Sequence, residues 1–250
     1  MESRRLLDEA LRIGILYPGH SAEDDFSRLA ATLMPPVEVH VVHTGGQDQH
    51  KIGPCLETGS LEYLLPGVNY LRDFNIRVCM WACTSGSFVY GLSGAKRQVR
   101  EIAELLGVPS SSTSLGFLNA VRALKISRVA IAATYPEELA RAFCSFLNEA
   151  SIQVVHLGCM GILTGKEVGC IGQDTVLRFT RENDHPEAEA VLVPDTALHG
   201  VSYIGQLEIS VRKPVLTANL VTMWEALRLV GRRTPQSGLG RLMEVTLEPD

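Results

Sequence analysis

The chain lacks the features that mark nucleic-acid-binding and membrane proteins. Of its 250 residues, 23 are Lys or Arg and 28 are Asp or Glu, which gives a net charge of −5 and no expected basic surface. No apolar run approaches the roughly 20 residues that span a bilayer. The N-terminal arginines are followed by acidic residues, where a signal peptide has its apolar segment. These absences predict a soluble, cytoplasmic protein with no nucleic-acid or membrane partner.

Metal-binding and nucleotide-binding motifs are missing as well. The chain has 6 cysteines, but none forms a CxxC pair and no histidine cluster accompanies them at zinc spacing. Neither GxGxxG nor GxxxxGKS/T occurs, so no nucleotide phosphate loop is expected. The sequence therefore predicts no metal site and no cofactor, and most of the thiols fit reduced core residues.

Short apolar runs alternate with amphipathic stretches along the whole chain. The β-rich runs have the length and boundaries of buried parallel strands, and they span 12–18, 37–44, 76–84, 128–135, 152–158, 190–196 and 213–219. Helical apolar periodicity occurs in 95–107, 114–125, 136–150 and 220–230. This alternation predicts an α/β fold with parallel sheets.

Polar or glycine-rich segments follow four of the predicted strands. They are YPGHS (17–21), CTSGS (83–87), TYPEE (134–138) and PDTALHG (194–200). Because sites in open α/β sheets lie beyond the carboxyl ends of the strands, these exits are expected to meet. Both halves of the chain also run strand, polar exit, helix and a later strand followed by Thr. We therefore predict two pseudo-symmetric half-domains, residues 1–112 plus 215–250 and residues 113–214, with the active site in the cleft between them.

The motifs themselves resemble a known family. WACTSGSF (81–88), RIGILYP (12–18), AATY (132–135) and KPVLTANLVTMWEALRLVG (213–231) are similar to the aspartate/glutamate racemase superfamily, most closely its maleate cis-trans isomerase and arylmalonate decarboxylase branch. The resemblance covers essentially the whole chain. It implies two Rossmann-like halves and cofactor-independent chemistry at the carbon next to a carboxylate, with one cysteine from each half. It also implies a small carboxylate substrate and a homo-oligomer.

The resemblance assigns roles to particular residues. Cys83 matches the first-half cysteine, Thr84, Ser85 and Tyr135 would bind the substrate carboxylate, and Asn219 matches a family asparagine. Cys83 taken alone could be an inert core thiol. The Thr-Ser-Gly-Ser segment after it could form an anion cradle that lowers the thiol pKa, or could cap a helix.

The chain departs from the family pattern at the second cysteine. Asp195 stands before Thr196, where the resemblance predicts a Cys-Thr pair. Asp195 is either an acid/base group facing Cys83 or the N-cap of a helix. In a desolvated cleft its pKa would rise from about 3.9 and make it a useful proton donor. Tyr17 and Thr196, at two of the exits, are also predicted to contact the substrate.

Histidines near the exits offer two candidate imidazole bases. His20 follows the first predicted strand and His199 follows Asp195 within the same exit. Each alone is more typical of a surface loop.

These observations favour an isomerase or racemase of a small dicarboxylic or amino acid, in which Cys83 is the thiolate base or nucleophile. Two alternatives remain open. One is a decarboxylase of a substituted malonate, because loss of carbon dioxide gives the same enediolate. The other is a carboxylate-binding protein without catalytic activity.

Overall fold

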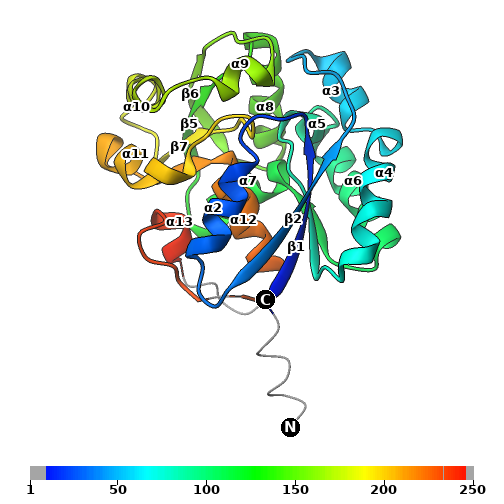
Figure 1. Ribbon diagram of the computed structural model, residues 1–250. Helices are drawn as coiled ribbons and strands as arrows, with labels where there is room; N and C mark the ends of the chain where they lie inside the picture. Colours follow the sequence, from blue (N-terminus) through cyan, green and yellow to red (C-terminus); the bar gives the residue numbers. More distant parts are fainter. Residues whose placement is uncertain (1–9, 233, 246–250) are drawn as a thin grey trace.

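The computed structural model describes residues 10–232 and 234–245, which form two parallel four-stranded sheets (Figure 1). The strands are β1 (Leu11–Pro18), β2 (Val37–Thr44), β3 (Val78–Trp81), β4 (Ser110–Ser112), β5 (Arg128–Ala133), β6 (Gln153–Cys159), β7 (Ala190–Val193) and β8 (Val215–Thr217). Their order is β2-β1-β3-β4 in one sheet and β6-β5-β7-β8 in the other. The second order repeats the first, so the two halves share one topology. This confirms the predicted α/β fold with two similar halves.

The helices of the first half cover both faces of its sheet. They are α2 (Asp24–Thr32), α3 (Ile52–Thr58), α4 (Leu61–Leu71), α5 (Ser85–Phe88) and α6 (Gly91–Leu106), with the short 3-10 turn η1 (Arg72–Phe74). Successive strand residues point to opposite faces. Leu16 and Trp81 therefore pack against α4 and α6, whereas Ile15 and Met80 face the main core with α2.

The remaining helices belong to the second half or join the two halves. They are α7 (Thr113–Ala123), α8 (Glu137–Glu149), α9 (Gly165–Gly169), α10 (Gln173–Glu182), η2 (Val201–Tyr203), α11 (Ile204–Val211), α12 (Ala218–Leu229) and α13 (Arg241–Glu244). All helices predicted from apolar periodicity are present, as α6, α7, α8 and α12.

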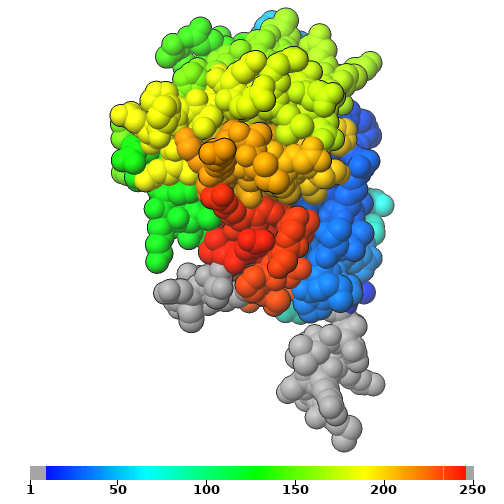
Figure 2. Space-filling view, turned by 90° about the vertical axis from the view of Figure 1, so that its left-hand side faces the viewer, coloured from blue at the N-terminus to red at the C-terminus, as the bar shows by residue number. Residues whose placement is uncertain are grey.

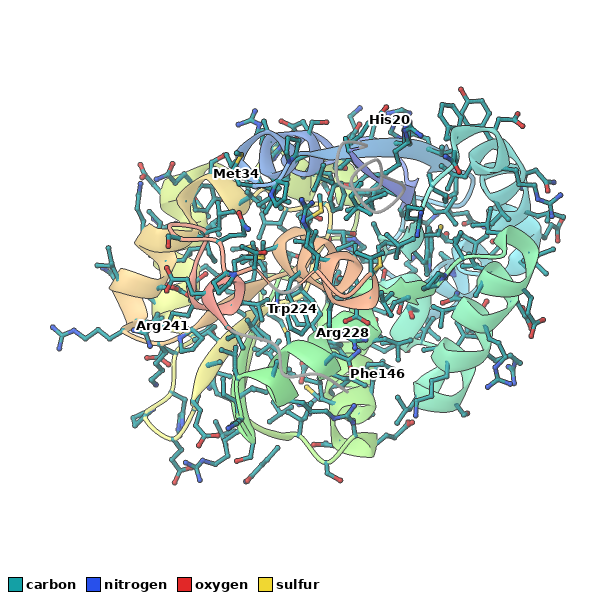
Figure 3. All side chains as sticks on the ribbon, turned by 90° about the horizontal axis from the view of Figure 1, so that it is seen from below. His20, Met34, Phe146, Trp224, Arg228 and Arg241 are labelled. Carbon is teal, nitrogen blue, oxygen red and sulfur yellow. The ribbon has the colours of Figure 1, made fainter. Side chains whose placement is uncertain are left out.

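Helices α7 and α12 pack against each other in the middle of the molecule (Figure 1). Thr113 and Thr222 join them through a 2.6 Å hydrogen bond between their hydroxyl groups. Trp224 of α12 lies buried near the centre of the view in Figure 3. One continuous hydrophobic core therefore extends across both halves.

The chain crosses between halves close to the predicted boundary. Strand β8 pairs with β7 and belongs to the second sheet, while α12, which follows it directly, packs on β3 and β4 of the first sheet. The prediction had assigned residues from 215 onward to the first half, so β8 is a correction to that boundary. The three buried residues of β8 pair in parallel with β7, and this pairing makes β8 the edge strand of the second sheet. The wider division into half-domains stays a prediction.

The C-terminal segment holds α2 and α11 together. Gln236 bonds both the N–H and the carbonyl group of Met34, and Glu208 of α11 accepts from the N–H of Arg241. Figure 2 shows this red segment lying between the orange α11 region and the blue α2 region. No helix among the described residues is long and apolar enough to cross a membrane.

Candidate active site

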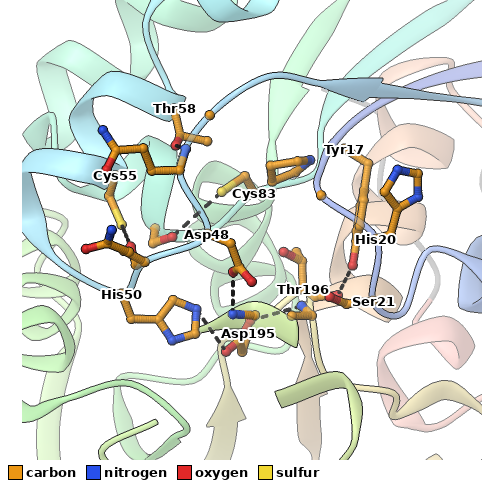
Figure 4. A pocket seen from close by; sticks show the side chains of 18 of the residues that line it. Tyr17, His20, Ser21, Asp48, His50, Cys55, Thr58, Cys83, Asp195 and Thr196 are labelled. Carbon is orange, nitrogen blue, oxygen red and sulfur yellow. Dashed lines mark hydrogen bonds and ion pairs between the residues drawn. The ribbon is translucent and has the colours of Figure 1, made fainter. Parts of the chain in front are cut away.

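A pocket of about 120 Å³ lies where strand exits from both sheets meet (Figure 4). Its lining includes residues 17–21 after β1, 45–50 after β2, Cys83 and Ser85 after β3, and residues 195–197 after β7. The volume is about four times a water molecule's share of the liquid, which is about 30 Å³. The pocket therefore suits a small ligand, and three of the four predicted exits line it.

Cys83 follows β3 and ends in a buried position, with 6% of its surface exposed. Its Sγ accepts a hydrogen bond from the Gly86 N–H at 3.2 Å and lies 3.7 Å from the Ser85 hydroxyl. Burial, together with the nearby Cys55 thiol, raises the pKa of Cys83 to about 12. The expected lowering of this pKa by an anion cradle is therefore wrong, because desolvation outweighs the hydrogen bond from the Gly86 N–H. The resting group is a neutral thiol that can donate a proton.

A second thiol, which the sequence did not single out, lines the same pocket. Cys55 lies in α3, and its Sγ donates to the Gln49 carbonyl at 3.7 Å. Burial raises its pKa, while a hydrogen bond to the Ser85 hydroxyl lowers it. Ser85 thus stands between two neutral thiols.

Asp195 follows β7 as Cys83 follows β3, so the two residues occupy equivalent places in the two halves. Its Oδ1 accepts from the Ala197 N–H at 2.9 Å, and its Oδ2 accepts from the Thr134 hydroxyl. The helix-cap interpretation is wrong, because the next helical turn, η2, is preceded by Gly200. Asp195 instead fixes a turn and remains in the pocket lining.

His50 is the partner of Asp195 that sequence reasoning missed. Its Nδ1 lies 2.9 Å from the Ile162 carbonyl, and its Nε2 lies 3.9 Å from Oδ2 of Asp195. Since a carbonyl oxygen can only accept, Nδ1 must carry a proton, whereas Nε2 lies too far from Oδ2 of Asp195 for a direct hydrogen bond and can bond a ligand. The ring packs edge-to-face on Tyr135 at 5.0 Å. Figure 4 shows His50 and Asp195 together, apart from Cys83.

The two histidines that the sequence did predict lie elsewhere. His20 lines the pocket, but its side chain is 74% exposed. His199 is not part of the lining and bonds Asp24 at 2.7 Å through Nε2. Neither occupies the buried position beside Asp195.

The predicted carboxylate-binding residues divide into two groups. Ser85, Thr196 and Tyr17 line the pocket. The Tyr17 hydroxyl donates to the Thr196 carbonyl at 3.0 Å and accepts from the Ala22 N–H at 3.1 Å, so it joins the two halves. Burial raises the pKa of Tyr17 and keeps the phenol neutral.

Three others lie outside the pocket lining. Thr84 is fully buried, and Tyr135 donates to the Pro194 carbonyl at 2.7 Å. Asn219 is the second residue of α12 and donates to Asp25 of α2 at 3.2 Å, so this bond joins α12 to α2 and involves no pocket residue. The roles of Thr84, Tyr135 and Asn219 in substrate binding stay a prediction.

The loop of residues 45–50, here called the roof loop, crosses from the first sheet to the second. Asp48 accepts from the Gly165 N–H at 2.5 Å and from the Lys166 N–H at 3.1 Å. The His50 N–H donates to the Leu163 carbonyl at 2.8 Å. The roof loop therefore encloses the pocket with residues from α9 and the segment before it.

Comparisons with known proteins agree with this architecture. Residues 65–243 match the family model for arylmalonate decarboxylase. The arylmalonate decarboxylase of Bordetella bronchiseptica is 28% identical over 166 residues, which cover 64% of this chain and 68% of that protein. The maleate isomerase of Nocardia farcinica is 22% identical over 238 residues, which cover 93% and 95% of the two chains.

Solved structures show the same fold. A variant of the maleate isomerase Iso from Pseudomonas putida S16, crystallised with maleate, superposes with a TM-score of 0.86 at 17% identity, over 95% of this chain and 98% of that one. A mutant of arylmalonate decarboxylase in a liganded form gives 0.83 at 22% identity, over 94% and 98%. With the family model covering most of the chain, the protein belongs to the arylmalonate decarboxylase family, in the branch of the aspartate/glutamate racemase superfamily that includes the maleate isomerases.

Proposed function

We propose that the protein catalyses cofactor-independent proton transfer at the carbon next to the carboxylate of a small carboxylic acid, as an isomerase or racemase. One observation carries this proposal. The Cys83 thiol and the Asp195 carboxylate, at equivalent exits of the two sheets, line the same small pocket. A reaction that removes a proton and returns it elsewhere needs two such groups around one carbon.

The neutral thiol of Cys83 suggests how the two groups divide the work. Asp195, with Nε2 of His50 beside it, is the base that takes the proton from carbon. The electron pair of that bond moves into the carboxylate and forms an enediolate. Cys83 then donates its S–H proton to the carbon, because burial keeps the thiol neutral until that step. The resulting thiolate and protonated base return to the resting state by exchange with water.

The enediolate also needs hydrogen-bond donors aimed at its oxygens. Ser85 and Thr196 carry hydroxyl groups in the pocket lining, one from each half. We assign them to the substrate carboxylate.

Decarboxylation of a substituted malonate is the second candidate, and the match to the arylmalonate decarboxylase model favours it. A neutral thiol suits this reaction as well, because the enediolate left after loss of carbon dioxide needs one proton donor. The pocket holds two candidate acid/base groups, Cys83 and Asp195, whereas decarboxylation needs only one proton donor. Proton transfer without carbon–carbon cleavage gives both groups a role.

The test is proton exchange followed by NMR in deuterated water, with amino acids, hydantoins, maleate and substituted malonates. We expect exchange or isomerisation that is lost in Cys83→Ala and in Asp195→Asn, and reduced in His50→Gln. Cys170→Ala is the matched control, because Cys170 is an exposed thiol away from the pocket lining.

The outcomes separate the candidates. Deuterated monoacid formed from a malonate, dependent on Cys83 but not on Asp195, would favour the decarboxylase. Ligand-induced thermal shifts without exchange on any compound would overturn the enzyme proposal and favour a carboxylate-binding protein.

A further inference from the structure

Three side chains converge beside the pocket without a role in the proposed reaction. His20 follows β1 and lines the pocket, Glu23 directly precedes α2, and His43 lies near the end of β2. One ligand atom from each of them lies within 4.8 Å of the other two. Figure 3 shows His20 at the edge of the molecule, where solvent and ions reach it.

The spacing of these atoms suits one metal ion. Oε1 of Glu23 lies 3.4 Å from Nδ1 of His20 and 3.9 Å from Nε2 of His43. Zinc binds histidine nitrogen and carboxylate oxygen at about 2.0–2.2 Å, so two ligands of a tetrahedral site lie about 3.4 Å apart. The atoms of Glu23 and His20 already have this spacing. The atoms of Glu23 and His43, at 3.9 Å, are farther apart and need a small shift of one of those two side chains.

Other hydrogen bonds fix the orientations of His43 and Glu23, whereas His20 stacks on His43 with ring centroids 3.8 Å apart and would turn its exposed side chain to reach the ion. Nδ1 of His43 lies 2.6 Å from the Gly19 carbonyl, so Nδ1 carries the proton and the lone pair of Nε2 faces Glu23. Oε2 of Glu23 accepts from the Ser21 N–H at 2.7 Å, which leaves Oε1 toward the imidazoles. Metal-ligating histidines and carboxylates characteristically have such outer partners, which set the tautomer and the orientation.

We propose that His20, Glu23 and His43 bind a divalent transition-metal ion of the zinc class. Two imidazoles favour zinc, copper or nickel over calcium and magnesium, which prefer all-oxygen sites. Three protein ligands also leave a coordination position for water or a ligand.

The position of this ion would matter to the pocket. Among the described residues that line the pocket there is no Lys or Arg, whereas Asp48 and Asp195 are both present. An ion held partly by His20 would place positive charge at its rim and attract an anionic ligand. The proton transfer proposed above includes no step that uses the ion, so a test of metal binding is independent of a test of that reaction.

The experiment is a titration of tag-free, full-length protein with Co²⁺, followed by calorimetry and visible absorption, without substrate. We expect one ion per chain and a spectrum without a sulfur-to-cobalt charge-transfer band. His43→Ala and Glu23→Gln should each weaken binding by more than about tenfold, since loss of an outer partner alone costs about 10- to 100-fold. The glutamine can still accept from the Ser21 N–H, so Glu23→Gln preserves the local fold.

His199→Ala is the matched control. His199 bonds Asp24 at the start of the same helix but is not among the three ligands. Its affinity for Co²⁺ should equal that of the wild type, and thermal denaturation should show all variants folded. Absence of binding, or equal binding by the wild type, His43→Ala and Glu23→Gln, would overturn the proposal. A sulfur-to-cobalt charge-transfer band that is present in the wild type and absent in Cys83→Ala would also overturn the proposal, because it would show that the ion binds a thiol.

Discussion

The buried thiol of Cys83 gives the sharpest prediction, because its pKa is raised to about 12. At pH 8 about one molecule in 10,000 would carry the thiolate, whereas about a quarter of free cysteine, with a pKa of about 8.5, is ionised. The thiolate fraction is therefore about 2,400-fold smaller. A more basic thiolate is also a better nucleophile, which recovers a factor of about 40 for a Brønsted slope of 0.4–0.5. Cys83 should thus react about 60-fold more slowly than free cysteine, before any limit on access.

The assay is modification by a small disulfide, such as 2-hydroxyethyl disulfide, with peptide mapping by mass spectrometry between pH 7 and pH 10. The rate at Cys83 should rise about tenfold per pH unit throughout this range, because the thiolate fraction does so below the pKa. A free cysteine peptide should level off above its pKa of about 8.5. A plateau at Cys83 below pH 10 would refute the argument that burial dominates this site.

Three further predictions concern positions around the core and the pocket. Burial raises the pKa of Glu208, so its contribution to stability is greatest below the ordinary carboxyl pKa and is lost as pH rises through the raised value. As pH rises from about 4 (near the ordinary carboxyl pKa) toward neutral, the melting temperature of Glu208→Gln should therefore rise relative to that of the wild type, and a constant difference would contradict this. A Cβ at Gly59 would lie 1.9 Å from a backbone oxygen of α5, so Gly59→Ala should lower the free energy of unfolding in denaturant by about 1–3 kcal/mol. Gly172→Ala, where the Cβ meets open space, should leave it unchanged, and equal losses in the two variants would contradict the packing argument. Thr134→Val removes a hydrogen bond to the Asp195 carboxylate that is worth about 1.5–3 kcal/mol, so it should slow the exchange reaction. Thr134→Ser keeps the hydroxyl donor and should keep the wild-type rate. Equal rates for the two variants would show that this hydrogen bond does not contribute to the reaction.

The strands and the location of the site could be predicted from the sequence because both follow from local patterns. Short apolar runs bounded by turns became β1, β2, β3 and β5 to β8, and three of the four predicted polar exits met at one pocket. Strand β4 is only Ser110–Ser112 and carries no apolar signal, so the sequence indicated a crossover there. Its pairing with β3 is decided by tertiary structure.

His50 was missed although a signal for it existed. The exit of the second strand, GGQDQH, is as polar and glycine-rich as the four that were noted, and it became the roof loop. Applying the strand-exit rule to every predicted strand would have included it. No such rule could have placed Asn219, because spacing does not reveal that its amide faces Asp25 of α2.

The pKa of Cys83 shows a different limit of sequence reasoning. The glycine and hydroxyl residues after it indicated stabilisation of an anion, and the Gly86 N–H does bond the sulfur. Desolvation depends on what the rest of the chain packs around the thiol, including Trp81 beside it in the same hydrophobic cluster. That long-range contribution outweighs the local donor.

The hydrogen bonds of Asp48 to the first residues of α9 have a practical consequence for a protein whose ligand is unidentified. The amide proton of Gly165 is held by Asp48, which lies in the roof loop and in the other half of the chain. For this proton to exchange with deuterated solvent, the carboxylate must release it. Hydrogen exchange at this one amide therefore reports how often the contact between the roof loop and α9 opens.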